Sequence, residues 1–161
     1  MDPQPKDLFG TWKTQIEAYQ IAHDKEAKQL ESRHYWVGLP ATIFAAVAGT
    51  TLFTELQDPR VKMLVGVIGL AAAVLAAVQT FLSLAKRAEQ HRSAAAQLGA
   101  VKREIEIIQE WQPASAEAKQ MAEDMNKRLT EIQNGAPTVN VPAEIGPLMR
   151  VSPAIEAFVN R

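Results

Sequence analysis

The sequence contains no cysteine, so disulfides, thiolate-zinc sites and cysteine nucleophiles are all excluded. It also lacks an excess of charge of either sign, because 17 Lys and Arg face 18 Asp and Glu for a net charge of -1. A chain without a bulk positive field has no general attraction for nucleic acid, and we expect no nucleic-acid partner. Its 161 residues have room for one domain, or one domain and a tail.

The most informative absence is that of charge from two long runs. Residues 36–54 and 63–85 contain no Asp, Glu, Lys or Arg, whereas four charged residues crowd into residues 55–62 between them. As helices, these runs of 19 and 23 residues would be about 28 and 35 Å long, against a hydrocarbon core of about 30 Å. We predict transmembrane helices at 36–54 and 63–85 with an external loop at 55–62. The disfavoured alternative is a buried Ala-rich hairpin within a soluble bundle.

The basic residues near the two spans predict their orientation. Eight lie on the flanking sides, against two in the loop, so both termini are expected in the cytoplasm. The eight are Lys25, Lys28, Arg33, Lys86, Arg87, Arg92, Lys102 and Arg103. A signal peptide explains the first run poorly, because 35 charged, helical-looking residues precede it.

The segments that flank the spans have the periodicity of helices. Residues 1–35 are expected to form a cytoplasmic N-terminal helix, and Pro40, early in the first span, admits either a kink or a break. Residues 86–112 are expected to continue the second span without interruption and to pair with the N-terminal helix. A heptad seam that starts at the end of the second span and runs through this segment consists of Leu84, His91, Ala94, Leu98, Val101, Ile105 and Ile108. The matching face of the N-terminal helix consists of Trp12, Ile16, Tyr19, His23, Ala27, Leu30 and His34.

Two further segments follow Pro113. Residues 113–135 are expected to hold a third cytoplasmic helix, with Ser115 as N-cap and Gly135 as stop signal. Residues 136–161 contain four prolines and are interpreted as a tail, either a flexible terminus or a docking peptide, with room for a short final helix. The predicted fold is therefore all-α: a two-transmembrane helical hairpin continuous with a cytoplasmic helical bundle or coiled-coil pair.

Few residues offer chemistry. The sequence has no phosphate-binding glycine loop, dinucleotide fingerprint, zinc-protease motif or nucleophile elbow. On helix geometry His34 and His91 would lie within about 10 Å of the membrane edge and His23 about 20 Å away, so a three-histidine metal site is unfavourable. Gln79 is the most polar residue of the second span and is expected to pair across helices or line a wet cavity. We predict no catalytic residue, metal or cofactor.

Small residues on the spans indicate close helix packing. Ala41, Ala45 and Gly49 form one stripe, and Gly69, Ala73 and Ala77 form another. A mildly polar stripe of Thr42, Ala46, Thr50 and Thr54 could face a lumen if several copies assemble. The plainer interpretation, which the pattern favours, is hairpin packing with threonine hydroxyls bonded to their own backbone.

Two segments resemble a known family. KRAEQHRSAAAQLGAVKREIE (residues 86–106), directly after the second span, and YQIAHDKEAKQLESRHYWVGLP (residues 19–40) are similar to the SLATT family, the SMODS and SLOG-associating two-transmembrane effector domains of bacterial defence systems. The resemblance covers about residues 7–112. It implies a non-enzymatic effector in the bacterial inner membrane that forms homo-oligomers and breaches the membrane lipid on activation. It also implies a nucleotide-second-messenger synthase or sensor protein, encoded nearby, as partner.

Two other classes stay open at this point. A membrane anchor or scaffold that recruits a cytoplasmic partner without forming a pore is the main alternative. A membrane enzyme that uses the histidines with Glu89 or Glu104 is a distant third.

Overall fold

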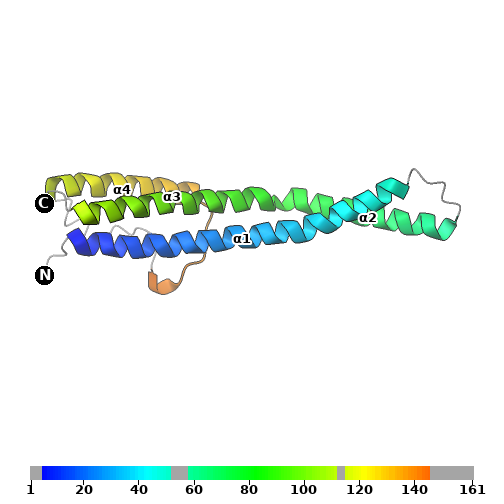
Figure 1. The fold of residues 1–161 in the computed structure, drawn as a ribbon, viewed down its shortest axis with the longest axis horizontal. Helices are drawn as coiled ribbons and strands as arrows, with labels where there is room; N and C mark the ends of the chain where they lie inside the picture. The colour runs from blue at the N-terminus through cyan, green and yellow to red at the C-terminus, as the bar shows by residue number, and fades with distance from the viewer. Residues whose placement is uncertain (1–4, 52–57, 112–114, 146–161) are drawn as a thin grey trace. The chain divides into compact units, whose positions relative to one another are not determined.

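The computed structural model describes residues 5–51, 58–111 and 115–145, which are almost entirely helical and contain no strand (Figure 1). The elements in chain order are α1 (Pro5–Thr51), α2 (Pro59–Leu82), α3 (Leu84–Trp111), α4 (Ser115–Gly135) and the short 3-10 helix η1 (Ala143–Ile145). They fall into two compact units. The unit Lys28–Ala88, called the hairpin below, holds the second half of α1 and all of α2. The bundle comprises α1 up to Ala27, α3 from Glu89, α4 and η1.

The bundle is built on the apolar faces of three helices. Its core combines α1, α3 and α4, and its largest fully buried side chains are Ile16, Leu98, Ile105 and Leu129. Neighbouring buried residues on each helix are three or four positions apart, the spacing that places side chains on one face. The core residues are Phe9, Trp12, Ile16, Leu98, Val101, Ile105, Ile108, Ala122, Met125 and Leu129.

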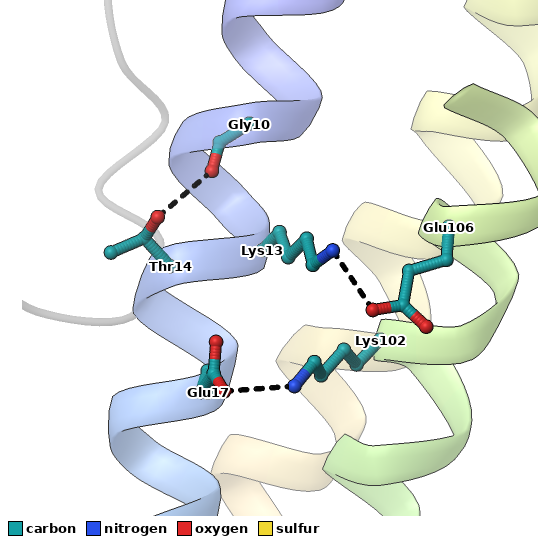
Figure 2. A network of polar contacts seen from close by, with 6 residues as sticks. All are labelled: Gly10, Lys13, Thr14, Glu17, Lys102 and Glu106. Atoms are coloured by element: carbon teal, nitrogen blue, oxygen red, sulfur yellow. Dashed lines mark hydrogen bonds and ion pairs between the residues drawn. The ribbon is translucent and has the colours of Figure 1, made fainter. Parts of the chain in front are cut away.

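Two ion pairs on the bundle surface join α1 and α3. Lys13 Nζ lies 2.9 Å from Glu106 Oε1, and Lys102 Nζ lies 3.0 Å from Glu17 Oε1 (Figure 2). From the first pair to the second, the residue number rises on α1, from 13 to 17, and falls on α3, from 106 to 102. The two helices are therefore antiparallel here. The Lys13 ammonium, as hydrogen-bond donor and opposite charge, lowers the pKa of the Glu106 carboxyl from its usual value.

The ends of α2 differ from the predicted span. The helix begins at Pro59, inside the segment assigned to the loop, because the Asp58 carboxylate caps it by accepting from the Arg60 amide at 2.8 Å. It ends at Leu82, since Ser83 adopts the left-handed conformation with φ 46° and ψ 39°. The expected uninterrupted helix over 63–111 is therefore wrong at this residue.

Helical hydrogen bonding nevertheless spans the interruption. The Ser83 amide donates to the Gln79 carbonyl at 3.2 Å, and the Ser83 carbonyl accepts from the Arg87 amide at 3.1 Å. The Ser83 hydroxyl donates to the Thr80 carbonyl at 3.2 Å, the kind of local bond by which serine competes with helix geometry. In α1, by contrast, the helix passes through Pro40 without a break.

The chain after α4 returns to α1. Residues 136–142 have no regular structure, and the Ile145 carbonyl at the end of η1 accepts a 3.2 Å hydrogen bond from Gln15 Nε2. The predicted final helix within the tail lies outside the described residues. So does the side chain of Ser115, the predicted N-cap of α4.

Candidate functional site: a membrane surface and two polar contacts

The outer surface of α2 beyond Lys62 is largely apolar. The described residues contain one helical stretch, Pro59–Trp111, that is long and apolar enough to cross a membrane, and only 6% of its most apolar window is buried. A core helix of a soluble protein with this composition would be mostly buried, because water penalises such a surface. The exposed side chains on α2 are Val61, Met63, Leu64, Val67, Leu70, Val74, Val78, Phe81 and Leu82. The first predicted span does not pass the same test over its described part, which ends at Thr51.

Gln79 pairs across the hairpin. Its Nε2 donates to the His34 carbonyl at 3.2 Å and lies 3.4 Å from His34 Nδ1. The side-chain amide of Gln79 lies against Gly38, where an added Cβ would collide with Gln79 Nε2. Of the two expectations for Gln79, pairing across helices is the arrangement that the structure contains. The sequence does not single out Gly38, because a glycine two residues before Pro40 gives no sign of which side chain crosses it.

The face of α2 that packs against α1 only partly coincides with the predicted stripe of Gly69, Ala73 and Ala77. Gly69 lies at the contact, since an added Cβ would sit 3.6 Å from Ala48 Cβ. Ala72 is buried, whereas Ala73 and Ala77 are exposed. On α1, Ala41 is buried and Gly49 is half-buried, but Ala45 is exposed. Ala73 and Ala77 thus lie outside the hairpin contact, and a role for them in association between copies stays a prediction.

The two threonines bond to their own helix. Thr42 Oγ1 donates to the Gly38 carbonyl at 3.0 Å, and Thr50 Oγ1 donates to the Ala46 carbonyl at 3.0 Å. Both residues are exposed. Self-bonded threonines tolerate lipid, because no hydroxyl hydrogen is left without an acceptor. Thr54, the fourth member of that stripe, lies outside the described residues.

His23 and His91 form a buried pair in the bundle. Their Nδ1 atoms are 3.0 Å apart, and the side chains are 3% and 7% exposed. One ring must donate Nδ1–H while the other accepts, so the pair is compatible with neutral imidazoles. Desolvation by burial lowers the pKa of both rings; the positive charge of His91 lowers the pKa of His23 further, and the Glu26 carboxylate opposes the effect at His91.

This pairing differs from the histidine placement expected along the helices. His91 was expected to lie near the level of His34, but it meets His23, and His34 contacts Gln79. The burial of the two histidines could be predicted in part from the sequence, because His23 and His91 each occupy an apolar helix face there. Four other seam residues, Leu98, Val101, Ile105 and Ile108, are buried in the bundle core, and Leu84 and Ala94 are buried as well. In the part of the chain that the structure describes, no group of three or more His, Cys, Asp or Glu residues is placed to hold a metal ion.

The described residues are thus almost entirely helical and include one helical stretch that is long and apolar enough to cross a membrane. A scan against family models matches residues 13–143 to "SMODS and SLOG-associating 2TM effector domain family 4". The chain belongs to this SLATT family, which is a family of effector domains and not a known enzyme family. No curated protein and no solved structure matches the chain.

Proposed function

We propose that this chain is a two-span effector of the bacterial inner membrane that oligomerises and permeabilises the membrane when its defence system is activated. The observation that carries the proposal is the exposed apolar surface of α2 in a chain whose family consists of two-transmembrane effectors. In this proposal the hairpin spans the bilayer, both termini are cytoplasmic and the partner is a nucleotide-second-messenger synthase or sensor encoded nearby.

The exposed small residues of α2 supply a surface for assembly. Lipid gives apolar helices no hydrophobic reason to associate, so close van der Waals contact between small residues has to do so. Ala73 and Ala77 are exposed one turn apart, on a face that the hairpin leaves open. We assign this face, with Gly69 at its edge, to contacts between copies.

Membrane depolarisation tests the proposal. Bacteria that produce the full chain and carry a membrane-potential dye should depolarise, and liposomes that contain the purified chain should release an entrapped dye. Ala73→Phe should abolish both effects without reducing the amount of protein in the membrane, because the larger ring adds apolar area but holds neighbouring backbones apart.

A matched control separates this effect from bulk alone. Val67→Phe also enlarges an exposed residue of α2, but at 100° per residue it lies about 120° around the helix from Ala73. It should permeabilise like the wild type. Insertion of the wild type without any depolarisation or leakage would favour the membrane anchor instead.

A further inference from the structure

One end of the hairpin carries three exposed aromatic side chains. The contact between His34 and Gln79 puts residues 34–36 of α1 level with the end of α2. At this level Tyr35, Trp36 and Phe81 are 71%, 77% and 88% exposed. Aromatic residues gather where membrane spans meet the headgroup region, because their rings suit the boundary between hydrocarbon and water. This end of the hairpin therefore fits a membrane–water interface.

The aromatic residues of α1 also line a groove. The depression has a volume of about 300 Å³ and is lined by Tyr35, Trp36, Leu39, Pro40, Ile43 and Phe44. Pro40 contributes in two ways: it lacks an amide hydrogen, which leaves the Trp36 carbonyl without its usual helical donor, and its ring forms part of the apolar floor. Further along α1, toward the membrane-spanning part, the exposed Val47 continues this apolar surface.

A basic residue stands at the polar end of this groove. Arg33 is exposed and lies three residues before Trp36, on the same helical face. The only other charged residue within four positions on α1 before the groove is Glu31, which is half-buried. An apolar groove with a guanidinium at its water-facing end matches the two parts of an anionic phospholipid. The acyl chain would lie in the groove, and the phosphate would lie at the arginine.

We propose that the groove at Trp36, Leu39 and Pro40 binds one anionic phospholipid of the cytoplasmic leaflet, with Arg33 contacting its phosphate. The proposal rests on the membrane placement of the hairpin given above. It commits to a lipid as the occupant, because the groove adjoins the exposed apolar surface and carries a positive charge at its interfacial end. A second copy of the chain is the competing occupant.

Tryptophan quenching by brominated phospholipids tests the site in the full chain reconstituted in nanodiscs. The signal of Trp36 is the difference between wild type and Trp36→Phe, which corrects for Trp12 and Trp111. Brominated phosphatidylglycerol should quench Trp36 at a lower mole fraction than brominated phosphatidylcholine, by about fivefold for one arginine near an anionic headgroup. Arg33→Gln should remove this preference, whereas Arg60→Gln, at the other end of the hairpin, should leave it unchanged.

Four outcomes would overturn the proposal, and they differ in what else they overturn. Equal quenching by both lipids in the wild type, or a preference that survives Arg33→Gln, rejects the lipid site but leaves the hairpin in the membrane. No quenching of Trp36 by either lipid rejects the membrane placement as well. Because the chain has no cysteine, Leu39→Cys introduces a single thiol. Efficient disulfide cross-linking of this variant between copies would assign the groove to a second copy.

Discussion

The Nδ1 atoms of His23 on α1 and His91 on α3 lie 3.0 Å apart inside the bundle, far apart in sequence but in direct contact in the fold. When both rings are neutral, one proton lies between the two Nδ1 atoms, bonded to one and accepted by the other. When both rings are protonated, two N–H groups and two positive charges face each other in a poorly hydrated place. The pair therefore links packing of the bundle to pH.

We expect the bundle to become less stable as the pH falls below about 6.5, the ordinary histidine pKa. The folded-state pKa values of His23 and His91 are lowered, so the unfolded chain binds more protons between 6.5 and those lower values. Stability is present above 6.5 and is lost as the pH falls through this window. Thermal unfolding followed by circular dichroism at pH 7.5 and 5.5 measures the loss. His91→Gln should flatten the dependence, and His34→Gln, outside the pair, should not.

Removing apolar volume from the seam should destabilise the bundle only where the residue is buried. Ile105 is 0% exposed and Ile107, two residues later on the same helix, is 62% exposed. We expect Ile105→Ala to cost about 2–5 kcal/mol of unfolding free energy, and Ile107→Ala less than about 0.5 kcal/mol. Denaturant unfolding in detergent gives both values, and equal values would contradict this core. Ile105→Asp should abolish permeabilisation while the chain still inserts in the membrane.

A methyl group at residue 38 should weaken the hairpin. Gly38→Ala places Cβ against Gln79 Nε2 and so displaces the hydrogen bond to the His34 carbonyl. Interhelical hydrogen bonds in membranes are worth about 0.6 kcal/mol on average, with steric displacement adding to this loss. Resistance to unfolding by dodecyl sulfate should fall in Gly38→Ala and recover in part when Gln79→Ala is added. Gly66→Ala, which meets nothing within 4 Å, is the matched control.

The residue between α2 and α3 should accept glycine and reject a branched side chain. Ser83 has a positive φ, a conformation that costs L-residues about 1–2 kcal/mol and costs glycine little. Ser83→Gly should therefore unfold at the same temperature as the wild type or higher, and Ser83→Val at a lower one. A higher unfolding temperature for Ser83→Val would show that the helix runs straight through this residue in solution.

The sequence by itself determined where the helices could lie and which faces of the bundle helices could pack. Charge-free runs, prolines and the Gly135 stop mark segment ends, and around Leu98 and Ile105 charged and apolar residues alternate with helical spacing, which singles out one face. Between Met63 and Val78 of α2 the side chains are apolar on every side of the helix, so the sequence offers no contrast that distinguishes Ala72 from Ala73.

Only the tertiary structure decided that Ala72 packs inside the hairpin, that Gln79 crosses Gly38 to reach His34, and that His23 meets His91. These relationships depend on the rotation and axial offset of one helix against another. Both are fixed by side chains from distant parts of the chain meeting in three dimensions, a property that periodicity along one helix does not contain.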